Sequence, residues 1–207
     1  MDFEGLGLYG KSLYEVAGKK EVIVRSVVEL TGKNQWDGVI VSAAPTELLN
    51  PGLFADLKAA LNIPVTTALN SSVAALRAYS AKRVLLLTPF EERLNKMICD
   101  YLTEAGFTVS APYPFRELGD AIRLTPDEVY ELAKRVCGDA GSADAIYFQG
   151  AVLDPVKVLE KIEKELETTV VASNPAMLWY IVSKLGRRNR IQSYGKLLAE
   201  WPMLPNE

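Results

Sequence analysis

The sequence predicts an α/β protein with two pseudo-symmetric lobes, in which mostly parallel sheets are flanked by helices. Short apolar runs alternate with longer helix-like segments, which is the pattern of a doubly wound parallel sheet. Residues 36–83 and 143–187 show the same order of features, which indicates an internal repeat. The chain has 207 residues and 49% hydrophobic content, enough for one large or two small packed cores.

The two copies of the repeat contain the same features in the same order. Each copy begins with an Asp and continues through an apolar run, a small-residue turn, a helix, a second apolar run and a final helix. Asp37 corresponds to Asp144, and the same offset pairs Ala43 with Gly150. If a pseudo-two-fold axis relates the copies, Ala43 and Gly150 are expected on opposite walls of one cleft.

The elements before the first repeated strand and within the first copy follow from apolar spacing. Residues 1–18 carry several glycines and are not assigned, whereas the valines after Lys20 predict a helix to Lys33. A continuous apolar run such as 38–41 is typical of a strand buried on both faces. Asn70 or Ser71 is expected to cap a helix to Tyr79. The expected elements are a helix over 20–33, a strand over 38–41, a helix over 51–61, a strand over 63–67, a helix over 71–79 and a strand over 83–88.

The second part of the chain carries clearer helix signals. Pro89 is expected to open a helix that Gly106 ends, and Thr125 to cap a helix with Pro126 at its first position. The Pro- and Arg-containing segment 111–124 is expected to be a loop, and the two-proline tail to pack along the surface. The remaining elements are a helix over 89–105, a strand over 107–110, a helix over 125–137, a strand over 145–148, a helix over 155–166, a strand over 169–172 and a helix over 175–185.

Composition excludes several classes of function. The net charge is −3 without a basic stripe, which argues against nucleic acid as a partner. The chain has no His, which excludes Ser-His-Asp and Cys-His mechanisms and a His-based metal site. Cys99 and Cys137 fall in helix-like patterns and are expected to be buried packing residues. Neither a secretory signal nor a run long enough to span a bilayer is visible, so we expect a cytoplasmic protein without a membrane partner.

Ligands of open parallel sheets bind beyond the carboxyl ends of the strands. Small and polar residues follow several predicted strands at that edge. Backbone N–H groups at such a strand-to-helix turn favour an anionic ligand such as a carboxylate. The candidate substrate-binding residues are Ala43, Ala44, Thr46, Thr66, Thr67, Thr88, Phe90, Gln149, Gly150, Ala151, Ser173 and Asn174.

Two acids occupy equivalent places in the copies. Glu47 and Asp154 are candidate catalytic residues as a carboxylate acid/base pair, or they are first-turn acids that interact with helix dipoles. A similar choice applies to the polar groups that follow the second strand of each copy, because helix capping and carboxylate binding use the same groups. These groups are Thr66, Thr67, Ser173 and Asn174.

The segment IPVTTALNSSVAALRAYSAKRVLLLTPF, followed by EAGFTV, resembles the aspartate/glutamate racemase superfamily. VVASNPAMLWYIVSKLG is similar to the second-half segment of its arylmalonate decarboxylase and maleate cis-trans isomerase branch, with Ser173, Asn174 and Trp179 in the matching places. The resemblance covers roughly residues 20–187. It implies two pseudo-symmetric domains and chemistry beside a carboxylate without metal or organic cofactor.

The resemblance also marks departures from the family pattern. It places the family's catalytic cysteines at Ala43 or Ala44 and at Gly150. Thr88-Pro89-Phe90 matches a segment in which the family has a Tyr hydroxyl. The family's first strand has no counterpart before residue 20, and an exposed sheet edge there favours a homo-oligomer.

We therefore expect a divergent isomerase, racemase or decarboxylase-like protein that binds a small carboxylic acid between its lobes without the usual cysteine pair. One alternative is a catalytically inactive small-acid binding or assembly protein on the same fold. Another is a lyase or hydratase with Glu47 or Asp154 as its base. The first lobe is expected to comprise residues 20–85 and 175–207 and the second residues 86–174, with residues 1–19 unassigned.

Overall fold

The chain forms two separate parallel sheets, as the fold class predicted. The computed structural model describes residues 4–112, 115, 118–140 and 142–206. The smaller sheet pairs β1 with β2, and the larger has the order β4-β3-β5-β6, with every neighbouring pair parallel. The strands are β1 (Val39–Val41), β2 (Val65–Thr67), β3 (Arg83–Leu87), β4 (Thr108–Ser110), β5 (Ala145–Phe148) and β6 (Thr169–Ala172).

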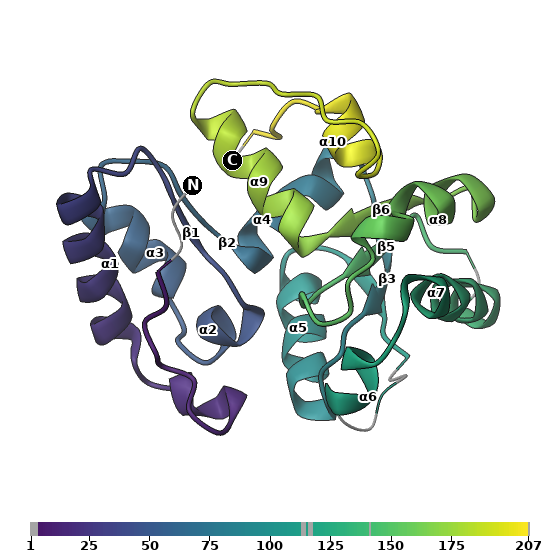
Figure 1. The fold of residues 1–207 in the computed structure, drawn as a ribbon, viewed down its shortest axis with the longest axis horizontal. Helices are drawn as coiled ribbons and strands as arrows, with labels where there is room; N and C mark the ends of the chain where they lie inside the picture. The colour runs from purple at the N-terminus through teal and green to yellow at the C-terminus, as the bar shows by residue number, and fades with distance from the viewer. Residues whose placement is uncertain (1–3, 113–114, 116–117, 141, 207) are drawn as a thin grey trace.

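The internal repeat is visible in the strand register. Val39 of β1 pairs with Val65 of β2, and the equivalent Ile146 of β5 pairs with Val170 of β6. The final helices of the two copies, α4 (Ala68–Ala78) and α9 (Ser173–Lys184), pack against each other between the two sheets (Figure 1). Equivalent helices of the two copies therefore meet between the two sheets, as expected for copies related by a pseudo-two-fold axis.

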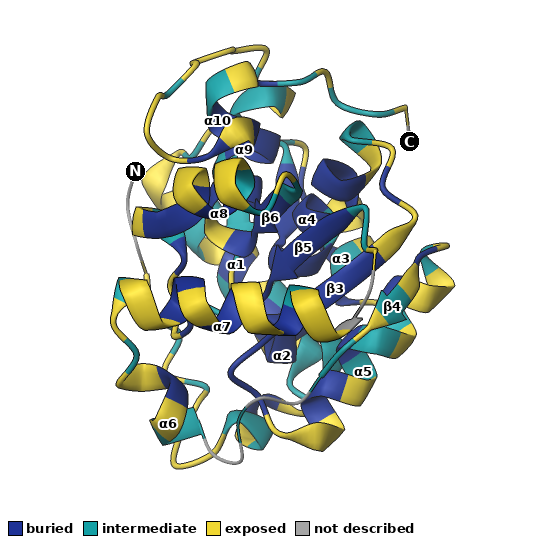
Figure 2. Cartoon of the chain, turned by 90° about the vertical axis from the view of Figure 1, so that its right-hand side faces the viewer, coloured by how far each residue is buried: buried dark blue, intermediate teal, exposed yellow. Residues whose placement is uncertain are grey.

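Helices cover the sheets and form three apolar cores. In the first lobe, α1 and α3 pack on β1 and β2. In the second, α7 and α8 cover one face of the larger sheet, while α4, α5, α9 and α10 cover the other. Figure 2 shows the buried strands β3 and β5 behind α7, whose outer face is exposed. The remaining elements are η1 (Leu13–Val16), α1 (Lys20–Asn34), α2 (Ala44–Leu48), α3 (Leu53–Ala60), α5 (Glu92–Glu104), α6 (Leu118–Ile122), α7 (Pro126–Ala140), η2 (Val156–Val158), α8 (Leu159–Glu165) and α10 (Lys196–Glu200).

The helix starts show which capping predictions were correct. Thr125 and Glu128 form a reciprocal capping box, in which the Thr125 backbone N–H donates to Glu128 Oε2 at 2.7 Å. The prediction for α4 was wrong, because Thr67 caps the helix by accepting from the Asn70 N–H at 3.1 Å. Likewise α5 begins at Glu92 rather than Pro89, because the Glu91 side chain accepts from two backbone N–H groups of its first turn.

Two expected boundaries need correction. The predicted division after residue 85 falls inside β3, which pairs with β4 and β5 in the larger sheet along its whole length, so residues 83–85 belong with the second lobe. The tail does not simply follow the surface. Trp201 is 1% exposed, and the Trp179 indole N–H donates to the Pro202 carbonyl at 3.0 Å. Residues 113–114, 116–117 and 207 of the expected loop and tail, like residues 1–3, lie outside the described residues.

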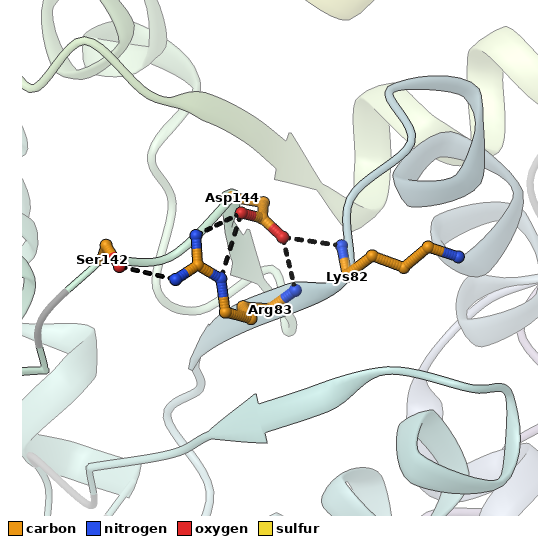
Figure 3. Close-up of polar contacts among 4 residues, drawn as sticks. All are labelled: Lys82, Arg83, Ser142 and Asp144. Carbon is orange, nitrogen blue, oxygen red and sulfur yellow. Dashed lines mark hydrogen bonds and ion pairs between the residues drawn. The ribbon is translucent and has the colours of Figure 1, made fainter.

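The repeated Asp of the second copy joins β5 to β3 at the amino ends of the strands. Asp144 accepts from the backbone N–H groups of Lys82 and Arg83, at 2.9 and 2.8 Å (Figure 3). The Arg83 guanidinium donates to the same carboxylate at 2.7 Å and to Ser142 Oγ at 2.6 Å. These hydrogen bonds hold the pKa of Asp144 well below its usual range. Asp144 therefore stabilises the sheet at the amino ends of its strands, opposite the carboxyl ends where the candidate site lies.

No helix in the described part of the chain is both long and apolar enough to cross a bilayer.

Candidate functional site

Equivalent turns follow β1 and β5. Ala43 has φ +68° and Gly150 has φ +106°. A positive φ is unfavourable for a residue with a Cβ, and such strain concentrates at functional sites. Both copies of the repeat thus keep an unusual backbone conformation at the place where the sequence predicted paired cleft residues.

Gly150 is enclosed by the β3–α5 turn. A Cβ at this position would lie 2.9 Å from Pro89 Cδ and 3.3 Å from Phe90 Cζ. Thr88 fixes that turn, since its hydroxyl accepts from the Phe90 N–H at 3.1 Å and pairs with Asn95. A thiol-bearing residue at position 150 would require Pro89 to move.

Glu47 lies buried in α2, four residues after the Ala43 turn. Glu47 is 9% exposed, and its Oε1 accepts a hydrogen bond from the Tyr101 hydroxyl of α5 at 3.1 Å. Its other oxygen, Oε2, makes no hydrogen bond among the described residues. Burial raises the pKa of Glu47, and the hydroxyls of Thr67 and Tyr101 partly offset that rise. A buried carboxyl with a raised pKa is a candidate acid or base.

A second tyrosine extends this polar interior to β5. Tyr147 is completely buried, and its hydroxyl donates to Gln149 Oε1. Burial raises the pKa of Tyr147, and the Ser72 hydroxyl partly offsets that rise. We call Glu47, Tyr101, Tyr147 and Gln149 the buried Glu47 cluster. It joins α2 of the first lobe to α5 and β5 of the second.

The second copy forms an open depression instead of a buried cluster. Asp154 is exposed, and its Oδ1 accepts from the Val156 N–H at 3.1 Å. Glu47 is not among the described residues that line this depression, so the predicted Glu47/Asp154 pair does not share one cavity in this structure. The lining residues are Phe148, Gly150, Ala151, Asp154, Pro155, Val156, Ala172, Ser173, Asn174 and Pro175.

The choice between capping and ligand binding has different answers in the two copies. Thr67 caps α4, and the Thr66 hydroxyl donates to Asn70 Oδ1 at 3.0 Å. The equivalent cap residue of α9 is Ala172, which has no side-chain capping bond. Ser173 and Asn174 follow it and line the depression.

The N-terminal segment, unassigned from sequence, covers the start of α2. The Tyr9 and Thr46 hydroxyls lie 2.6 Å apart, and the Tyr14 hydroxyl donates to Glu91 at the start of α5. Tyr9 is 36% exposed whereas Thr46 is 7% exposed, so the segment shields an expected substrate-binding residue. Repeat and strand-end reasoning missed Tyr9, Tyr101 and Tyr147, although a Tyr in an otherwise apolar pattern signals a hydroxyl that needs a partner.

The two thiols lie on two different helices, α5 and α7. Cys99 of α5 and Cys137 of α7 are half-buried and pack against different cores. Burial raises the pKa of both thiols, which disfavours the nucleophilic thiolate. Neither is among the described residues that line the depression.

Two parallel sheets joined through α4 and α9, with matched turns at Ala43 and Gly150, define a duplicated α/β protein. The chain belongs to the arylmalonate decarboxylase family, whose sequence profile matches residues 44–198. This confirms the expected branch of the aspartate/glutamate racemase superfamily.

Individual relatives agree with this assignment. The arylmalonate decarboxylase of Bordetella bronchiseptica is 26% identical over 194 residues, which cover 87% of this chain and 80% of that protein. A maleate isomerase of Geobacillus stearothermophilus is 23% identical over 140 residues, which cover 66% of this chain and only 55% of the isomerase.

Solved structures show the same fold. A crystal structure of arylmalonate decarboxylase superposes with a TM-score of 0.76 at 22% identity, covering 87% of this chain and 84% of that one. The maleate isomerase Iso from Pseudomonas putida S16 gives 0.78 at 19% identity, covering 92% and 81%.

Proposed function

We propose that this protein binds a small carboxylic acid between its lobes and catalyses isomerisation, racemisation or decarboxylation without a cysteine pair, a metal or an organic cofactor. The observation that carries the proposal is the pair of positive-φ turns at Ala43 and Gly150, at equivalent strand ends of the repeat. The positive φ is strained at Ala43, which has a Cβ, and such strain persists only where the surrounding structure maintains it.

The relatives support this substrate class. Arylmalonate decarboxylase and maleate isomerase are named for carboxylic acids, and one maleate isomerase structure was determined with maleate. A mutant of the Nocardia farcinica maleate cis-trans isomerase carries a covalently bound succinylcysteine intermediate. In this chain, Ala43 and Gly150 offer no thiol for such an intermediate, so the proton chemistry must come from other groups.

The depression in the second lobe has a volume of only about 10 Å³, so just one end of such an acid would enter it. Ser173 and Asn174 supply polar groups, while Phe148, Ala172 and Pro175 provide apolar wall. Asp154 shares this depression, and its carboxylate would repel an acid bound beside it. We therefore assign the carboxylate of the ligand to Ser173, Asn174 and the Gly150–Ala151 backbone.

Glu47 is the proposed acid/base, and because it does not line the depression, this role requires α2 to open towards an acid bound there. General acid–base catalysis contributes about 10²–10⁴-fold, so Glu47→Gln should reduce turnover by at least about 10²-fold. Maleate, arylmalonates, aspartate and simple aromatic acids would be assayed by NMR for product and for exchange of the α-proton in D₂O. A Cys99→Ala/Cys137→Ala double variant is the control and should keep its activity. Loss of activity in that control would refute a thiol-independent mechanism.

A non-catalytic small-acid binder is the second candidate, and one observation favours it. Pro89 and Phe90 occupy the space next to Gly150, so the turn is closed to a side chain there. A ligand present at 100 times its Kd should stabilise the folded state by about 2.7 kcal/mol. A thermal shift with these acids and no turnover would favour the binder, and turnover of any of them would favour the enzyme.

The expected homo-oligomer remains a proposal. In the two-stranded sheet, β1 and β2 are both edge strands. Pairing of an edge strand with a second copy of the chain is one way to satisfy its free backbone groups. Sedimentation analysis at several concentrations would detect such an assembly, and a monomer throughout would argue against it.

A further inference from the structure

The buried Glu47 cluster contains an unexplained oxygen. Glu47 Oε2 is buried and makes no hydrogen bond among the described residues, although its neighbour Oε1 does. Leaving a buried polar atom unpaired costs about 1–3 kcal/mol, and more if the group is charged. Such atoms in a folded protein call for a chemical explanation.

Charge balance around Glu47 points to a neutral carboxyl. The influences on its pKa are burial, Thr67 and Tyr101, and none of them is cationic. The titratable groups near it are the phenols of Tyr101 on α5 and Tyr147 on β5, while Tyr9 from the N-terminal segment reaches the adjacent Thr46. The Arg77 guanidinium of α4 lowers the pKa of Tyr101 but is not among the influences on Glu47. An ionised carboxylate buried without a cation or a full set of donors is strongly disfavoured.

The contact with Tyr101 leaves Oε2 as the oxygen without a hydrogen bond in the described part of the chain, and on it we place the proton of a neutral Glu47. Burial raises the pKa of Tyr101, so its hydroxyl keeps its proton and donates to Oε1. Tyr147 donates to Gln149 instead. Because Oε1 already accepts, the proton of a neutral Glu47 belongs on Oε2.

We infer that Glu47 is a neutral carboxylic acid whose Oε2 holds an exchangeable proton, and that Tyr101 is the positioning residue that fixes this arrangement. Nothing in the sequence pattern assigned a role to Tyr101, which lies on a helix outside the repeat. Tyr101 acts through Glu47 by holding Oε1 and stabilising the carboxylate that forms after proton transfer.

The use of this proton rests on the proposed function. In the protonation step, the Oε2–H bond breaks and the electron pair of a substrate enediolate forms the new C–H bond. Glu47 is left as a carboxylate that accepts from Tyr101. The reverse step removes an α-proton and restores the neutral acid, so atoms and charge balance without a co-reactant. Glu47 is 9% exposed, so a substrate reaches Oε2 only after local opening around α2.

Infrared titration tests the inference independently of turnover. The carbonyl band of a neutral carboxylic acid would be followed against pH in the wild type, with Glu47→Gln identifying the band. We expect the Glu47 band to persist above pH ~4.3, the ordinary pKa of Glu. Tyr101→Phe removes a donor to the carboxylate and should move the titration upward by a further ~1–2 pH units.

Tyr130→Phe is the matched control. Tyr130 also has a buried ring and donates to a glutamate, Glu165 Oε2, at 2.5 Å, but it lies on α7 outside the cluster. This variant should leave the Glu47 band unchanged. Titration of Glu47 at its ordinary value, or equal effects of the two Tyr variants, would overturn the inference. A persistent band in a protein without α-proton exchange would leave the protonation of Glu47 intact and reject catalytic function instead.

Discussion

After β1 the chain turns at Ala43 and buries Glu47 in α2, whereas after β5 it turns at Gly150 and leaves Asp154 exposed in a depression. The strand register and the final helices of the two copies correspond, so the framework does not explain the difference. The difference arises from the elements that pack around each turn, because α5 and the N-terminal segment cover the turn at Ala43. Duplication has preserved the framework while the two acids acquired opposite environments.

The largest expected difference between the copies is in core stability. Ile146 is fully buried in β5, which has a partner strand on each side, whereas the equivalent Val39 lies in a two-stranded sheet. Ile146→Ala should reduce the free energy of unfolding by about 3–4 kcal/mol and Val39→Ala by about 1.5 kcal/mol. Denaturant unfolding measures both. An equal or larger loss for Val39→Ala would show that the smaller sheet carries the stability.

Reciprocal substitutions at the turns should have opposite signs. Gly150→Ala places a Cβ 2.9 Å from Pro89 Cδ at a positive φ and should cost about 2 kcal/mol. Ala43→Gly relieves the strain at φ +68° and should gain about 0.5 kcal/mol. For a chain of this size, the melting temperature should change by about 2–4 °C per kcal/mol. Destabilisation by both changes would mean that Ala43 is not strained.

The smallest effect concerns pH. Because the folded-state pKa of Glu47 is raised above its unfolded value, its contribution to stability is present at acidic pH and is lost as pH rises through the folded-state pKa. Glu47→Gln should therefore gain stability relative to the wild type as pH increases from about 4 to 8. Thermal unfolding across this range measures the trend, with Asp154→Asn as an exposed control. A constant difference between wild type and Glu47→Gln would contradict the raised pKa.

The sequence predicted the parallel strands and the repeat because buried strands leave continuous apolar runs and because both copies retain the same order of features. It misplaced the start of α4, since Thr67, Asn70 and Ser71 are all good capping residues and only the fold selects Thr67. It also divided the lobes inside β3, because strand partners are long-range contacts that local patterns do not contain.

The candidate site was less predictable. Strand ends indicated Gly150, Ser173 and Asn174, which the structure brings together in one depression. The contact between Glu47 and Tyr101 joins separate elements, and periodicity reads such a Tyr as another core aromatic. Predicting it would have required the packing of α2 on α5, which depends on the tertiary fold.

The packing of residues 201–202 against α9 has a consequence for folding. Trp201 is buried, its indole N–H donates to Ser183 Oγ at 2.9 Å, and Trp179 donates to the Pro202 carbonyl. During synthesis, α9 therefore lacks these partners until residue 202 has left the ribosome. Two of the three tryptophans take part, so intrinsic fluorescence offers a built-in signal for the docking of this segment.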